Sequence, residues 1–76
     1  MPVVIKTKPF NYDFLLLSEE EQKQAIKALR FLAENPRHPS LKTHKIEGTF
    51  FFEAYVNKDI RIIFERTSDT IILRAI

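Results

Sequence analysis

The chain has 76 residues, which is the size of one small domain, so residues 1–76 are expected to form a single domain. A hydrophobic content of 45% provides a core, and the absence of cysteine excludes disulfides, thiolate metal sites and thiol nucleophiles. No apolar run is long enough to span a membrane, and the first residues lack a signal-peptide pattern. We therefore expect a cytoplasmic protein with no membrane partner.

The net charge of +2 is confined to one segment of the chain. Outside residues 35–48, the basic and acidic groups balance. The segment itself holds three basic residues and one acidic residue: Arg37, Lys42, Lys45 and Glu47. A neutral body with one basic loop indicates a polyanionic partner, and a solvated surface loop is the alternative interpretation.

The first third of the chain predicts a strand followed by a short helix. β-Branched residues favour a strand over Met1–Lys8, and Pro9 ends its hydrogen-bond ladder. Apolar residues at helical spacing then predict a first helix over residues 10–17.

A second helix is predicted from its two ends and its apolar stripe. Ser18 is a candidate N-cap, and Glu21 completes a capping box three residues later. Apolar residues recur with a period of 3.6 over residues 22–33. Asn35 and Pro36 are expected to end the helix.

The remainder predicts short strands joined by tight turns. A stiff loop is expected over residues 36–43, and Gly48 is the predicted turn after a short strand. The predicted strands are His44–Ile46, Phe50–Val56, Ile60–Arg66 and Thr70–Ile76. Because such turns join antiparallel strands, we predict an α+β fold. It consists of an N-terminal strand, a two-helix hairpin and a three- to four-stranded antiparallel meander packed on the helices.

Strand alternation separates a buried face from an open one. Apolar positions such as Phe50, Phe52, Ile62, Leu73 and Ala75 are expected to lie under the helices. The open face is expected to carry Phe51, Glu53, Tyr55, Arg61, Ile63, Glu65, Ile72, Arg74 and Ile76. These charges form either cross-strand ion pairs on a solvated face or a shallow site for an anionic ligand, and the apolar members suggest cover by a partner.

Several kinds of site are disfavoured by the residues present. His38 and His44 have no third ligand for a metal ion, and a single glycine excludes a glycine-rich phosphate loop. No metal and no cofactor are therefore expected. An enzyme built from this chain would use Arg, Lys, His, Glu or Tyr.

The order of motifs along the chain resembles that of the RelE/ParE-superfamily toxins. The matching segments are 33–41 (AENPRHPSL), 45–48 (KIEG), 52–56 (FEAYV), 59–64 (DIRIIF) and 69–73 (DTIIL). The resemblance implies a toxin of a type II toxin–antitoxin system. In that family, RelE-like toxins cut messenger RNA on the ribosome, ParE-like toxins inhibit DNA gyrase, and an antitoxin protein neutralises both.

The resemblance also implies roles for individual residues. Arg61 matches the strand arginine that contacts the reacting phosphate in the nucleases, and the segment around His44 matches a loop that supplies basic residues. The candidate catalytic residues are Arg61, His44, Lys45, Glu53 and Tyr55. The candidate RNA-binding residues are Arg37, Lys42 and Arg74.

Two departures from the family pattern leave alternative functions open. Glu53 and Tyr55 stand where active relatives carry lysines, and a family tail that often supplies a catalytic His or Tyr is absent after Ile76. The main interpretation is a metal-independent, ribosome-dependent endoribonuclease, attenuated by the missing tail. The alternatives are a binding module that acts on gyrase or an antitoxin, and a folded remnant without activity.

The expected protein partner is an acidic, amphipathic antitoxin segment that folds on binding. Its carboxylates would pair with Arg61 or with the basic loop. The final strand, residues 70–76, is expected to be an edge or near-edge strand that adds a strand from the antitoxin or from a second copy, giving a homodimer.

Overall fold

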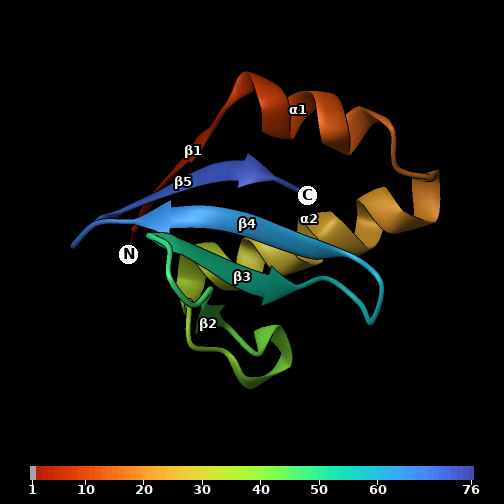
Figure 1. Cartoon of the computed structure of the whole chain (residues 1–76). Coiled ribbons are helices and arrows are strands. Elements are labelled where there is room, and N and C mark those ends of the chain that lie inside the picture. The colour runs from red at the N-terminus through yellow and green to blue at the C-terminus, as the bar shows by residue number, and fades with distance from the viewer. Residues whose placement is uncertain (1) are drawn as a thin grey trace.

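The computed structural model describes residues 2–76 as one sheet with two helices beside it (Figure 1). The elements are β1 (Val3–Lys6), α1 (Lys8–Leu15), α2 (Glu19–Glu34), the 3₁₀ turn η1 (Pro39–Leu41), β2 (His44–Lys45), β3 (Phe51–Tyr55), β4 (Arg61–Arg66) and β5 (Thr70–Ala75). This order confirms the predicted α+β class. The predicted first strand began at Met1, which lies outside the described residues.

The sheet has five strands in the order β1-β5-β4-β3-β2. Strands β2 to β5 form the predicted antiparallel meander, and β1 pairs in parallel with β5. In Figure 1, α2 crosses behind the sheet, and α1 lies along the end of the sheet that holds β1 and β5. No helix among the described residues combines the length and apolar character needed to cross a membrane.

Helix α1 begins two residues before its predicted start. Thr7 is its N-cap and accepts a hydrogen bond from the Phe10 backbone N–H at 3.4 Å. Pro9 lies in the first turn, where its missing N–H has no helical partner to lose, so proline opens this helix. Strand β1 ends at Lys6 and not at the predicted Lys8, because Thr7 already caps the helix. The helix ends at Leu15 and not at residue 17.

Helix α2 has the ends that its sequence predicts. The Ser18 hydroxyl accepts from the Glu21 backbone N–H at 3.2 Å, and Glu21 Oε1 accepts from the Ser18 N–H at 2.8 Å. The capping box is therefore confirmed, and Asn35 is the C-cap. The helix buries Ala25, Ala28 and Leu32, so most of its apolar stripe faces the core, whereas Ile26, predicted as part of that stripe, is 49% exposed.

The core lies between α2, α1 and one face of the sheet. The strands bury the alternate residues Ala54, Ile62, Phe64, Ile71 and Leu73, as the alternation predicts. The helices and η1 contribute Phe10, Ala28, Leu32 and Leu41. Among the described residues, no polar or charged residue is buried.

A β-bulge corrects the predicted faces at the end of β5. Ile63 pairs with Ala75 and Phe64 pairs with Leu73, so Arg74 is an extra residue in β5. An extra residue reverses the alternation. Ala75 therefore lies on the open face with Ile63, and Ile76 packs against the core, contrary to the prediction.

A second correction concerns Phe50, which was expected in the core. Strand β3 begins one residue later, and the Phe50 side chain is 86% exposed.

The final strand is not an edge of the sheet, contrary to the prediction of strand addition at residues 70–76. Strand β5 is paired with β1 on one side and β4 on the other. After the pairing with β1 ends, the Ile76 backbone N–H donates to Asp13 Oδ2 at 3.3 Å. The edges are β1 and β2, so a homodimer through β5 has no free backbone to use.

Candidate functional site

Strand pairing brings four side chains together on the open face of the sheet. His44 in β2 is directly opposite Glu53 in β3, and Tyr55 in β3 is directly opposite Arg61 in β4. Glu53 and Tyr55 share a face because they are two residues apart in one strand. The four side chains therefore form one cluster that local sequence does not juxtapose.

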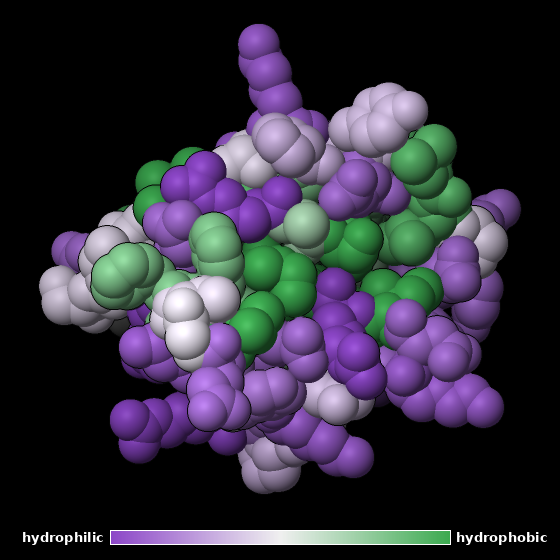
Figure 2. Space-filling view, in the orientation of Figure 1, coloured by the Kyte–Doolittle hydropathy of each residue, from purple (hydrophilic) through white to green (hydrophobic). Residues whose placement is uncertain are grey.

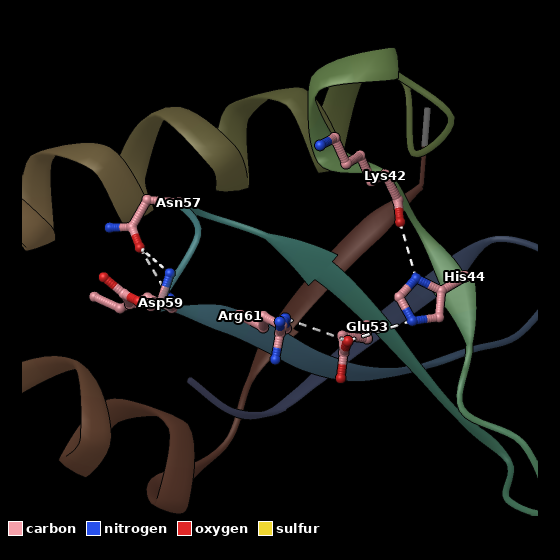
Figure 3. A network of polar contacts seen from close by, with 7 residues as sticks. Lys42, His44, Glu53, Asn57, Asp59 and Arg61 are labelled. Atoms are coloured by element: carbon pink, nitrogen blue, oxygen red, sulfur yellow. Dashed lines mark hydrogen bonds and ion pairs between the residues drawn. The ribbon is translucent and has the colours of Figure 1, made fainter.

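Glu53 is the centre of this cluster. Its Oε1 lies 3.3 Å from His44 Nε2 and 3.4 Å from Arg61 Nε (Figure 3). The Glu53 side chain is 20% exposed, whereas those of His44 and Arg61 are 52% and 43% exposed. One carboxylate oxygen thus lies between two partly solvated nitrogen groups.

The backbone of Lys42 sets the orientation of the His44 ring. Lys42 has a left-handed conformation with φ 47°, and its carbonyl oxygen lies 3.0 Å from His44 Nδ1 (Figure 3). A carbonyl only accepts hydrogen bonds, so Nδ1 carries a proton in this contact. The Nε2 atom then faces Glu53, and this contact becomes an ion pair when the ring is doubly protonated.

Tyr55 gives the cluster an aromatic wall. The Arg61 guanidinium carbon lies 4.6 Å from the ring centroid, and Lys42 Nζ lies 5.7 Å from it. The His44 ring is tilted at 46° with its centroid 6.3 Å away. Cation–π contacts of this kind are worth about 0.5–1 kcal/mol each at exposed sites.

The other predicted site residues lie outside this cluster. Lys45 is opposite Phe52 and extends to the other side of β2, where its Nζ lies 6.0 Å from the Phe50 ring centroid. Arg74 Nε lies 3.2 Å from Glu65 Oε1, so it has an ion pair of its own. Lys42, His44, Glu53, Tyr55 and Arg61 are the predicted residues that the structure brings together.

A groove of 430 Å³ adjoins the cluster on the side of the basic loop. Its lining includes Arg37, Lys42, His44, Lys45, Phe52 and Arg66. A smaller cavity of 280 Å³ lies between α2 and β3 and is bordered by Tyr55, Phe31 and Lys27. Tyr55 therefore separates the charged cluster from a pocket against the helix.

Arg66 lines this groove and Phe50 lies beside it, and neither is among the site residues predicted from the sequence. Arg66 is the last residue of β4 and lies on the same face of the strand as the buried residues Ile62 and Phe64. Phe50 stands just before β3. Both residues stand at the end of a strand, beyond the part of the sheet that the helices cover. Alternation predicts burial only where a helix covers the sheet, so the strand-end position was the signal that these two side chains are exposed.

The cluster has the components of acid–base chemistry on a phosphate. A guanidinium and a lysine ammonium supply positive charge, and an imidazole and a carboxylate can transfer protons. All of them reach solvent, so a large substrate has access.

Comparison with known proteins gives matches in structure and none in sequence. No protein-family model matches the chain, and no curated protein sequence matches it. YafQ from E. coli strain BL21(DE3) superposes with a TM-score of 0.80 at 16% identity, over 99% of this chain and 90% of that one.

Two further matches come from toxin–antitoxin complexes. A chain of the Staphylococcus aureus YoeB–YefM complex gives a TM-score of 0.77 at 12% identity, over 99% of this chain and 93% of that one. A chain of the Pyrococcus horikoshii RelE–RelB complex gives 0.79 at 18% identity, over 95% and 88%. The resemblance found in the sequence is thus confirmed for the fold: the chain has the RelE/ParE-like fold of type II toxin–antitoxin toxins.

Proposed function

We propose that this protein is the toxin of a toxin–antitoxin system and that it cleaves messenger RNA on the ribosome. The observation that supports this is that His44 and Arg61 both approach one carboxylate oxygen of Glu53, Oε1. Two donors that converge on one carboxylate oxygen are also arranged to bind a phosphate oxygen. Carboxylate and phosphate oxygens are both anionic acceptors of charge-assisted hydrogen bonds. A ribosomal target would place the activity in the cytoplasm.

The proposed reaction needs no metal ion. Glu53 accepts the proton of a ribose 2′-hydroxyl, and the 2′-oxygen attacks the adjacent phosphorus. Arg61 stabilises the negative charge of the pentavalent phosphate, and protonated His44 gives its proton to the departing 5′-oxygen. The products are a 2′,3′-cyclic phosphate and a 5′-hydroxyl end, with Glu53 protonated and His44 neutral.

The proposed partner is an acidic antitoxin segment that covers the open face of the sheet. Matching structures include the complexes named YoeB–YefM and RelE–RelB. Figure 2 shows hydrophobic side chains gathered in the middle of this face, with hydrophilic groups around them. Half-buried Phe51, Ile63 and Ile72 belong to this face by their register.

A second candidate function is a non-cleaving binding module, either a gyrase inhibitor or a protein that binds only its antitoxin. The observation in its favour is that Glu53 already occupies the position between His44 and Arg61. A carboxylate there opposes the approach of RNA phosphates unless it acts as the base.

Cleavage of messenger RNA in a translation extract separates the two functions. The wild-type protein should produce cleavage ends that primer extension detects, and Arg61→Ala should reduce their rate of formation by about 10² to 10³-fold. Arg30→Ala is the matched control, because Arg30 is an exposed arginine on α2. A wild-type protein that binds an acidic antitoxin segment but cuts no message would support the binding module and overturn the nuclease.

A further inference from the structure

A basic and aromatic surface continues from the His44 end of the cluster to the end of the sheet. The 430 Å³ groove beside His44 and a second groove of 440 Å³ share Lys45, Phe52 and Arg66. The second groove extends to Phe50 and Thr67. We call the continuous surface the Phe50 groove. The start of β3 and the end of β4 lie together at this end of the sheet (Figure 1).

Phe50 is displayed to solvent by an ordered turn. Its side chain is 86% exposed, more than any other large hydrophobic side chain among the described residues. The Ile46 N–H donates to the Phe51 carbonyl at 2.9 Å, and the Thr49 N–H donates to the Ile46 carbonyl at 3.1 Å. Gly48 has φ 78°, which closes the turn without strain. An aromatic ring held in water on a fixed turn is available for stacking.

The charges along the Phe50 groove are predominantly positive, and four of these cations have no carboxylate partner among the described residues. Arg37, Lys42, Lys45 and Arg66 take part in none of the ion pairs found among the described residues. The acidic residue that lines it, Glu65, is paired with Arg74 at 3.2 Å. Lys45 Nζ also lies 6.0 Å from the Phe50 ring centroid, so a cation and the exposed ring are neighbours.

We propose that the Phe50 groove binds single-stranded RNA, with one base stacked on Phe50 and backbone phosphates on Lys45 and Arg66. Aromatic rings beside backbone-tracking cations are the usual components of single-strand recognition, and every base offers a face to stack. This inference rests on the proposed function, for which the groove leads the RNA toward His44. An acidic peptide is less suited, because Phe50 and Phe52 are the apolar residues that line the groove beside Phe50, and a segment that folds on binding buries a larger apolar set.

Fluorescence anisotropy with a 12-nucleotide 2′-O-methyl RNA tests this binding in the full chain, since such RNA has no 2′-hydroxyl to react. Phe50→Ala should weaken binding about tenfold, and Phe50→Trp should retain it. Leu15→Ala is the control for loss of an exposed apolar side chain, because Leu15 is 74% exposed on α1. Lys45→Ala and Arg66→Ala should each lower the salt slope of log affinity by about 0.7, and Arg30→Ala should not.

The outcomes separate this inference from the proposed function. RNA binding that is insensitive to Phe50→Ala would overturn the Phe50 groove, whether or not the protein cleaves messenger RNA. Phe50-dependent RNA binding without any cleavage would support the groove and overturn the nuclease. A polyglutamate peptide that binds as tightly as the RNA, with no effect of Phe50→Ala on either ligand, would assign the surface to an acidic protein and overturn the inference.

Discussion

His44 and Glu53 are opposite each other across β2 and β3, with 3.3 Å between His44 Nε2 and Glu53 Oε1. Strand β2 has only two residues and is an edge strand of the sheet. The pair therefore lies at the edge of the sheet, where the basic loop joins it. Arg61 reaches the same carboxylate oxygen from the neighbouring strand β4. The carboxylate therefore connects three strands and holds both proposed phosphate-binding groups in place.

Replacement of Glu53 by glutamine should separate binding from chemistry. Glu53→Gln removes the negative charge that faces RNA, so RNA affinity should rise several-fold. The same change removes the proposed base, so single-turnover cleavage at saturating ribosomes should fall by about 10² to 10⁴-fold. Glu34→Gln, at the exposed end of α2, is the control. If cleavage rises together with affinity, Glu53 is an inhibitor of the site and not its base.

His44→Gln should impair cleavage far more than binding. The amide cannot donate a proton to the 5′-oxygen, so the single-turnover rate should fall by about 10² to 10⁴-fold. Affinity for 2′-O-methyl RNA should change less than threefold, because Arg61 and the Phe50 groove remain. Rapid-quench cleavage and anisotropy give the two quantities, and equal losses in both would remove His44 from proton transfer.

Lys42 combines a strained backbone with a functional side chain, and two substitutions separate them. Its φ of 47° costs a residue with a Cβ about 1 kcal/mol, which glycine avoids. Lys42→Gly should therefore be about 0.5–1 kcal/mol more stable than Lys42→Ala in urea denaturation. Both variants lose the ammonium near Tyr55, so their RNA affinities should fall equally. Different losses of affinity would show that the backbone turn itself matters for binding.

The capping box of α2 should be measurable as stability. Ser18→Ala removes the acceptor for the Glu21 N–H and should lower the free energy of unfolding by about 1 kcal/mol. Ser68→Ala, in the exposed turn before β5, should change it by less than about 0.5 kcal/mol. Urea denaturation followed by circular dichroism measures both. Equal effects would mean that the cap contributes nothing beyond an average surface serine.

Elements whose signals are local could be read directly from the sequence. The Ser18–Glu21 capping box acts over three residues, and strand alternation acts over two, so α2 and the buried faces of β3 and β4 follow from neighbouring residues. The ordered motifs of the toxin resemblance were also sufficient to predict the fold that the solved structures share.

Only the tertiary structure decided the features that depend on pairing between distant segments. Two helices and three strands separate β1 from β5 in the chain, so no local pattern indicates that they pair in parallel or that β5 is interior. The bulge at Arg74 arises from register against β4, and it moves Ile76 from the open face to the core. The approach of His44 and Arg61 to one Glu53 oxygen likewise requires three strands in a fixed register. Alternation specifies which face a side chain occupies, whereas its partners across the sheet depend on register, which is a non-local property.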